Sequence, residues 1–119
     1  MPRAKGGFKT RRRRKKVLDM AKGFYSGRSR LFRVATEAVD TALGHAFAHR
    51  KAKKRDFRSL WIARINAAAR QNDITYSRLM SGMREAGINL DRKVLADMAA
   101  TDPQSFEKLV TTVRQKLAS

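Results

Sequence analysis

Apolar residues recur at steps of three and four positions along most of the chain, which is the period of an α-helix. Between residues 30 and 72 there is no proline, and a narrow apolar stripe runs through Phe32, Ala35 and Val39. This pattern predicts one rod-like helix of about 65 Å, which is too long for the interior of a small domain. No segment alternates convincingly between apolar and polar residues, so the sequence predicts an all-α protein.

Three shorter helices are predicted after the long one. The first begins at Thr75, a good N-cap, and ends at Gly87, and the second begins near Asn89. The third begins at Asp102, because Asp is a preferred N-cap and Pro103 is tolerated in the first helical turn. Together with the end of the long helix, their apolar positions predict the core of a small globule: Phe57, Leu60, Trp61, Ile65, Leu79, Met83, Val94, Leu95, Met98, Phe106, Leu109, Val110, Val113 and Leu117.

Lys and Arg are concentrated in the first half of the chain. Of the 119 residues, 28 are Lys or Arg, and the formal net charge is +18. Residues 1–60 hold 19 of these cations against 4 acidic residues, whereas residues 61–119 hold 9 against 6. Like charge at that density repels itself in a compact domain. The natural partner of the first half is therefore a polyanion whose phosphates neutralise it.

This asymmetry predicts two domains. Residues 1–57 are expected to form a long basic N-terminal arm and most of the long helix, disordered through about residue 55 in the free protein. Residues 58–119 are expected to form a C-terminal helical RNA-binding domain. Within the arm, a short basic helix is predicted at about residues 10–22, and Gly23 and Gly27 end it. Phe24 and Tyr25, between these glycines, would either stack on unpaired bases or pack the turn against the long helix, and the sequence favours neither.

Cations surround the axis of the long helix between residues 50 and 58. Duplex DNA offers a groove on one side of a helix, whereas folded RNA offers walls around it, so RNA is favoured over DNA as the partner.

Arg92 and Lys93, at the start of their helix, are the first candidates for selective contacts with RNA, and Arg64 and Arg70 are the second. The residues predicted to bind RNA are Arg3, Lys5, Lys9, Arg11, Arg12, Arg13, Arg14, Lys15, Lys16, Lys22, Phe24, Tyr25, Arg28, Arg30, Arg33, Arg50, Lys51, Lys53, Lys54, Arg55, Arg58, Arg64, Arg70, Arg92 and Lys93.

Catalysis and metal binding find little support in the sequence. Cysteine is absent, which excludes thiolate metal sites. His45 and His49 have the i, i+4 spacing of two zinc ligands, but no obvious third ligand follows, so no metal or cofactor is expected. There is no Walker-type glycine-rich loop and no nucleophile with a paired base, so the chain is not expected to be an enzyme.

Two alternatives are binding proteins of other kinds. A DNA-compacting architectural protein would need a dimer interface and apolar wedges for the minor groove. Neither is apparent in the sequence, and no homo-oligomer is needed. A membrane-active helix would need a broad apolar face opposite its charge, and the alanine-rich stripe is too weak for that. No apolar run is long enough to span a membrane.

Four segments carry a resemblance to a known family. KRDFRSLWIARIN at residues 54–66, closed by Arg70, is the most specific. MPRAK at residues 1–5, AKGFY at 21–25 and NLDRKVLAD at 89–97 accompany it. Together with the run of arginines and lysines at residues 11–16, these segments resemble the bacterial large-subunit ribosomal protein L20 family over essentially the whole chain.

The resemblance implies an all-α protein whose long N-terminal helix is threaded through large-subunit (23S) rRNA. Its C-terminal helical domain would lie on the rRNA surface. The resemblance also implies a role in early assembly of the large subunit, within the ribosome of the cytoplasm, rather than in peptide-bond chemistry. Large-subunit ribosomal proteins thirteen and twenty-one would be its neighbours. It implies further that, in some bacteria, the C-terminal domain represses translation of its own messenger RNA.

Overall fold

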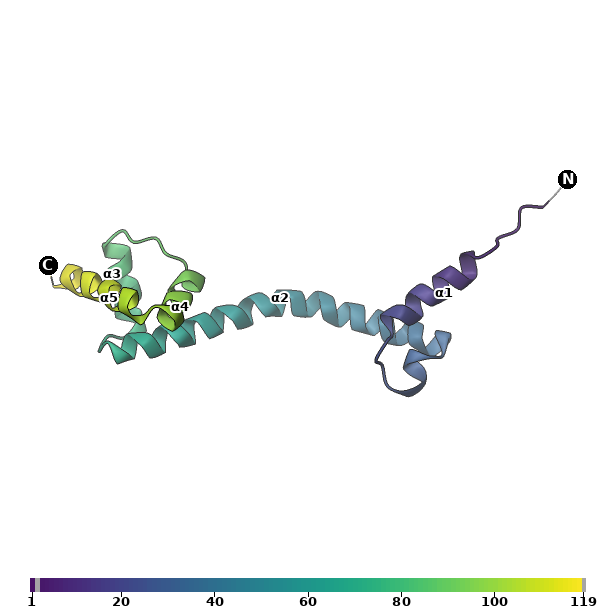
Figure 1. Cartoon of the computed structure of the whole chain (residues 1–119), viewed down its shortest axis with the longest axis horizontal. Coiled ribbons are helices and arrows are strands. Elements are labelled where there is room, and N and C mark those ends of the chain that lie inside the picture. The colour runs from purple at the N-terminus through teal and green to yellow at the C-terminus, as the bar shows by residue number, and fades with distance from the viewer. Residues whose placement is uncertain (2, 119) are drawn as a thin grey trace. The chain divides into compact units, whose positions relative to one another are not determined.

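The computed structural model describes residue 1 and residues 3–118, so Pro2 of the opening motif and Ser119 of the predicted C-terminal domain lie outside the described residues. The helices are α1 (Lys9–Met20), the short 3-10 helix η1 (Ser26–Ser29), α2 (Phe32–Gln71), α3 (Tyr76–Glu85), α4 (Arg92–Thr101) and α5 (Pro103–Leu117), as Figure 1 shows. The described residues contain helices and no strand. This confirms the predicted all-α class, with one long helix followed by a small helical globule.

Side chains cap the starts of α3 and α5 as the sequence predicts. Thr75 Oγ1 accepts a hydrogen bond from the backbone N–H of Arg78 at 3.4 Å. Asp102 Oδ1 accepts one from the backbone N–H of Ser105 at 3.1 Å, and Pro103 occupies the first turn of α5. The Ser105 hydroxyl also donates to Asp102, and this bond, together with the backbone bond, lowers the pKa of the Asp102 carboxyl.

The start of α4 corrects the prediction that this helix begins near Asn89. Asp91 is the N-cap, and its Oδ1 accepts a hydrogen bond from the backbone N–H of Val94 at 2.8 Å. The backbone of Asp91 is extended, so the chain enters the helix only at Arg92. Asn89 and Asp91 are both favourable N-cap residues, and the extended backbone at Asp91 makes it the residue that caps the helix.

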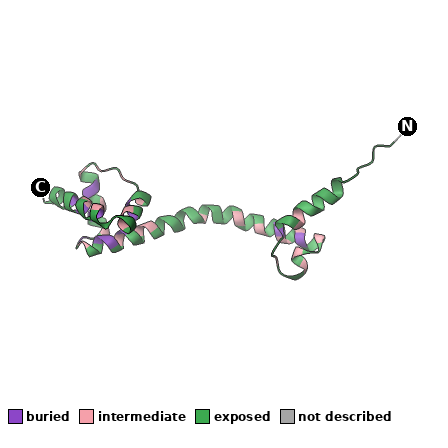
Figure 2. Cartoon of the chain, in the orientation of Figure 1, coloured by how far each residue is buried: buried purple, intermediate pink, exposed green. Residues whose placement is uncertain are grey.

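The chain folds into two compact units, residues 1–51 and residues 52–119, which we call the N-terminal unit and the C-terminal unit. The division between these units lies after Lys51, within α2, and the functional boundary after Phe57 stays a prediction. Helix α2 therefore contributes residues to both units. Figure 2 shows that each unit has its own buried residues.

The core of the C-terminal unit is formed by the end of α2 and by α3, α4 and α5. The buried residues that the sequence predicted there are Ile65, Leu79, Met83, Leu95, Phe106, Val110 and Val113. The predicted core residues Trp61, Met98 and Leu109 are half-buried and pack against this cluster. Small side chains that the apolar stripe did not single out, among them Ala69 and Ala96, are also buried.

Four predicted core residues are wrong, because they are 40–45% exposed: Phe57, Leu60, Val94 and Leu117. Phe57 and Leu60 precede Ile65, the first buried residue of α2 in this unit, so they lie on α2 before it enters the core. Val94 is in the first turn of α4, beside Leu95, which takes the buried position. Leu117 is the last residue of α5.

The N-terminal unit has a much smaller core. Its buried hydrophobic residues are Ala21, Ala35 and Val39, and the partly buried side chains of Val17, Leu18 and Phe24 pack against them. Two of the three buried side chains are single methyl groups, so little apolar surface is removed from water. This cluster joins the end of α1 to the first turns of α2.

Replacing Gly82 by alanine is expected to destabilise the C-terminal unit. A Cβ atom at Gly82, in α3, would lie 2.4 Å from Cγ1 of Val113 and 3.0 Å from Cδ1 of Leu117, both in α5. Val113 is buried and cannot turn away. Overpacking of this kind costs about 1–3 kcal/mol, which exceeds the gain of about 1 kcal/mol that alanine has over glycine in a helix. Urea unfolding followed by circular dichroism measures the effect.

Gly44→Ala is the matched control for this substitution. Gly44 is also inside a helix, but a Cβ atom there would meet no other atom within 4 Å. The same change should therefore leave the unfolding midpoint of the C-terminal unit unchanged and raise the helical content of α2. A Gly82→Ala variant as stable as the wild type would contradict the close packing of α3 on α5.

Candidate nucleic-acid interface

Helix α1 presents the arginine run on all of its faces. The six consecutive cations from Arg11 to Lys16 turn by about 100° per residue, and every one of them is exposed. The guanidinium groups of Arg13 and Arg14 lie 5.5 Å and 5.3 Å from the ring centroid of Phe32, at the start of α2. Such cation–π contacts orient two of the cations and leave their N–H groups free for phosphate.

The middle of α2 carries the second group of cations. Arg50 and Lys51 end the N-terminal unit, and the Lys51 ammonium lies 4.8 Å from the ring centroid of Phe47. Lys53 begins the cationic part of the C-terminal unit and lies 5.9 Å from the ring centroid of Phe57. All of these cations are exposed, as are Lys54, Arg55 and Arg58. Exposed aromatic rings on α2 thus orient the ammonium groups of neighbouring lysines.

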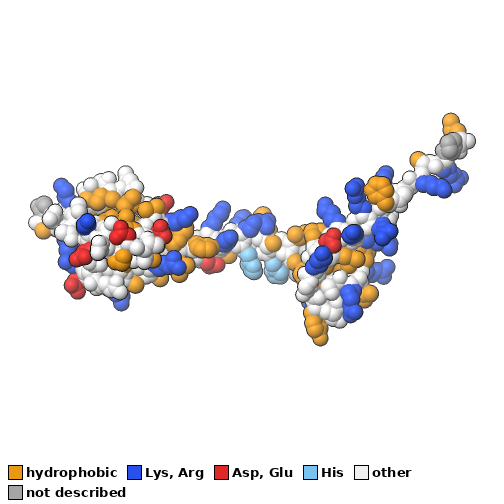
Figure 3. Space-filling view, in the orientation of Figure 1, with side chains coloured by type: hydrophobic (Ala, Val, Ile, Leu, Met, Phe, Trp, Pro, Cys, Tyr) orange, Lys and Arg blue, Asp and Glu red, His pale blue; other side chains and the backbone are white. Residues whose placement is uncertain are grey.

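The chain itself neutralises little of this charge. Within the described residues one ion pair is present, between Lys22 Nζ and Asp19 Oδ1 at 3.8 Å, and both side chains are exposed. A pair of that kind contributes little in water. Figure 3 shows Lys and Arg side chains gathered over α1 and along α2, with few acidic side chains beside them. The interface can therefore bind phosphates without first breaking internal ion pairs.

Every Lys and Arg predicted to bind RNA is exposed except Arg92, which is half-buried. Arg92 Nε donates a hydrogen bond of 2.9 Å to the Tyr76 hydroxyl, which ties α4 to α3. Lys93 beside it is exposed. The remaining predicted cations lie as follows: Arg3 and Lys5 before α1, Lys9 in its first turn, Lys22 after it, Arg28 in η1, Arg30 just beyond, and Arg33, Arg64 and Arg70 on α2.

The turn after α1 separates the two aromatic residues of the AKGFY segment. Phe24 is half-buried and packs against the small core of the N-terminal unit. Tyr25 is 88% exposed. The backbone on either side has positive φ, +86° at Gly23 and +56° at Ser26, and the latter is uncommon for a residue other than glycine. Of the two alternatives for this turn, packing describes Phe24, and base stacking remains a prediction for Tyr25.

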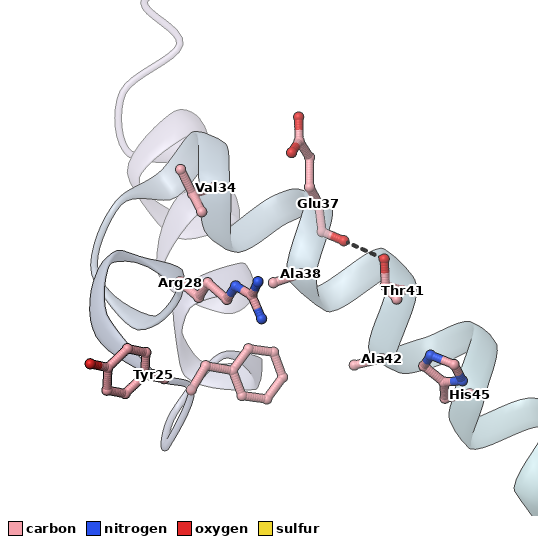
Figure 4. Close-up of a pocket in the computed structure, with 9 residues that line it drawn as sticks. Tyr25, Arg28, Val34, Glu37, Ala38, Thr41, Ala42 and His45 are labelled. Atoms are coloured by element: carbon pink, nitrogen blue, oxygen red, sulfur yellow. Dashed lines mark hydrogen bonds between the residues drawn. The ribbon is translucent and has the colours of Figure 1, made fainter.

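Sequence reasoning missed a groove between this turn and α2, which we call the turn groove (Figure 4). Its volume is about 650 Å³, and its lining residues are Phe24, Tyr25, Arg28, Val34, Glu37, Ala38, Thr41, Ala42 and His45. The signal in the sequence was the spacing of Ala38, Thr41 and Ala42 at steps of three and four, which places short side chains on one face of α2. That face becomes a groove only because the turn lies beside it.

His45 and His49, the pair with the spacing of zinc ligands, contact each other on α2. Their rings are stacked with centroids 6.0 Å apart. Among the described residues no group of three or more His, Cys, Asp or Glu side chains could hold a metal ion. Over the same part of the chain, no helix combines the length and the apolar character that crossing a membrane requires.

Comparison with known proteins gives one consistent result. A family model described as "Ribosomal protein L20" matches residues 3–109. The large ribosomal subunit protein bL20 of Geobacter sulfurreducens is 60% identical over 114 residues, which cover 96% of this chain and 97% of that protein. The bL20 of Geobacter metallireducens is 57% identical over 117 residues, 98% of this chain and 100% of that protein. The bL20 of Syntrophotalea carbinolica is 59% identical over 117 residues, 98% and 99% of the two chains.

Proposed function

Because the chain belongs to the ribosomal protein L20 family of the large subunit, we propose that it binds large-subunit (23S) rRNA directly and promotes early assembly of the subunit. The family is a structural one, so the chain is a ribosomal protein and not an enzyme. Its place is the ribosome, in the cytoplasm. What the proposal adds is the way in which each unit would engage RNA.

The observation that carries the proposal is the distribution of unpaired cations around α1 and α2. The N-terminal unit holds 15 Lys and Arg against 3 acidic residues, a net charge of +12. Because these cations point to every side of their helices, phosphates on several sides are needed to neutralise them. Folded rRNA supplies such surroundings, and the cations in turn screen the repulsion between the RNA helices that surround them.

The C-terminal unit is proposed to supply selectivity. It holds 13 Lys and Arg against 7 acidic residues, a net charge of +6 over a larger unit. Bulk attraction is weaker there, so a few placed groups must select the RNA. Arg92, held by Tyr76, and the neighbouring Lys93 are the first candidates. The same unit is proposed to repress translation of its own messenger RNA, and large-subunit proteins thirteen and twenty-one are proposed as neighbours, by family resemblance.

Separate fragments test this division of roles. Fragment 52–119 contains a complete core and is expected to fold alone and to discriminate the large-subunit rRNA from a scrambled hairpin, with a shallow dependence on salt. Fragment 1–51 is expected to bind both RNAs tightly at low salt and to discriminate poorly, because its contacts are mainly to phosphate. Filter binding across a salt series measures both properties.

The full chain is the control for these fragments. It should co-sediment with the large subunit after a high-salt wash, whereas neither fragment should promote subunit assembly alone. Equal selectivity in the two fragments would show that the division of roles is wrong. Failure of the full chain to prefer large-subunit rRNA over duplex DNA would overturn the proposed function as a whole.

A further inference from the structure

We infer that the turn groove holds one unpaired base of the bound RNA. The inference rests on the proposed function, since it names a ligand group within that RNA. It goes beyond neutralisation of phosphates, because a base in the groove would be recognised by its flat face and its polar edge. The size, the side chains and the charge of the groove each support this occupant.

The size and floor of the groove suit a flat group. A volume of about 650 Å³ is within the range of about 300–1,000 Å³ that is typical of small-ligand sites. Ala38 and Ala42 are one turn apart on α2 and face the groove (Figure 4). Their methyl groups allow a planar ring to approach the helix closely, which longer side chains at these positions would prevent.

Stacking partners lie on the opposite side, in the turn. Tyr25 is 88% exposed, and its ring lies beside the groove and points away from α2 (Figure 4). The Arg28 side chain extends from η1 toward Ala38 (Figure 4). Aromatic rings and guanidinium planes are the groups on which proteins stack unpaired RNA bases. Arg28 is therefore the planar group that faces the floor of the groove, and the exposed Tyr25 ring beside it offers a second stacking surface for the same stretch of unpaired RNA.

Polar groups for the edge of the base come from α2. The Thr41 hydroxyl donates to the carbonyl oxygen of Glu37 at 3.1 Å, so its oxygen is left to accept a hydrogen bond, as from an exocyclic amino group. His45 offers ring nitrogens at one end of the groove. The Glu37 carboxylate points away from Arg28 and Tyr25 (Figure 4), so the groove keeps the positive charge of Arg28. That charge favours a base flanked by phosphates over an apolar or a cationic peptide.

Two variants of the full chain test the inference with purified large-subunit rRNA. Ala42→Leu fills the floor of the groove without changing any charge, and Tyr25→Ala removes the ring at its rim. Ala48→Leu and Leu43→Ala are the controls, because both residues are exposed on α2, do not line the groove and contact none of the interface cations. Dimethyl sulfate reports the accessibility of unpaired bases, and hydroxyl radicals report contacts to the RNA backbone.

The wild type and both controls are expected to protect at least one unpaired base that Ala42→Leu and Tyr25→Ala leave reactive. Affinity should fall by roughly 5- to 150-fold in these two variants, the range that base–aromatic stacking supports. Backbone protection at saturating protein should be the same in all five proteins.

If no base protection depends on Ala42 or Tyr25 while backbone protection persists, the inference is overturned and the proposed function stands. If the base is protected only after another large-subunit protein is added, a protein occupies the groove and the inference is overturned. If the wild type protects neither bases nor backbone, the proposed function itself fails.

Discussion

Raising the salt concentration from about 50 to about 200 mM is expected to weaken binding of the full chain to large-subunit rRNA about ten-thousand-fold. If about eight phosphates are contacted, log affinity should fall against log salt with a slope of about −6 to −7. The large effect is expected because, among the described residues, the cations of α1 and α2 form no ion pair with an acidic side chain, so each phosphate contact releases counterions from the RNA. Filter binding at five or more salt concentrations measures the slope.

A charge variant shows which cations set that slope. Arg11, Lys15 and Lys16 are exposed on α1 and take no part in the cation–π contacts with Phe8 or Phe32. Replacing all three by glutamine should leave the helix intact and make the slope shallower by about 0.7–0.9 for each phosphate that the variant no longer neutralises. A slope of log affinity against log salt shallower than −2 for the wild type would contradict the proposal that RNA phosphates contact α1 and α2 on several sides.

Phe106→Ala is expected to unfold the C-terminal unit. Phe106 is 1% exposed and belongs to the central cluster. Truncating a buried phenylalanine costs about 3–5 kcal/mol, whereas a unit of this size has a free energy of unfolding of only about 3–10 kcal/mol. Urea unfolding followed by circular dichroism and by the fluorescence of Trp61 measures the loss, because the tryptophan packs against the same cluster.

Trp61→Ala and Phe57→Ala provide comparison variants for the same unfolding measurement, because these side chains are less buried than Phe106. Trp61 belongs to the core that the sequence predicts. Because the side chain is only half-buried at the edge of the cluster, a smaller loss than that of Phe106→Ala is now expected. Phe57 is 45% exposed, so its truncation should change stability by less than about 1 kcal/mol. A Phe106→Ala variant that unfolds at the wild-type urea concentration would contradict this core.

Local chemistry made the helix starts at Thr75 and Asp102 predictable, since a cap depends on residues within one turn. The start of α4 was harder, because Asn89 and Asp91 are both acceptable caps and the choice depends on where the backbone turns from extended to helical, which is at Asp91. Periodicity likewise marked an apolar face of α2 but could not show where that face enters the core. Phe57 was therefore assigned to the core, although the first side chain of α2 that packs against this cluster is Trp61 and the first buried one is Ile65.

The cations of the interface were predictable because charge in a sequence is also charge on a surface. The turn groove was not, because it depends on the tertiary position of the turn. Positive φ at Ser26, where a residue other than glycine stands, gives no sequence signal. The separation of Phe24 from Tyr25 follows from that turn, so the sequence alone left both roles open for both rings.

Helix α2 has unequal support at its two ends. Ile65, Ala68 and Ala69 are buried in a substantial core, whereas the first turns rest on the small cluster around Ala35 and Val39. Starting a helix is costly, but each further residue is added at nearly neutral free energy. The C-terminal unit can therefore serve as a permanent nucleus from which the helix grows toward its N-terminus, residue by residue, as phosphates cancel the charge ahead of it. Helix α2 would then fold as RNA binds along it, and both events would proceed from its C-terminal end toward its N-terminal end.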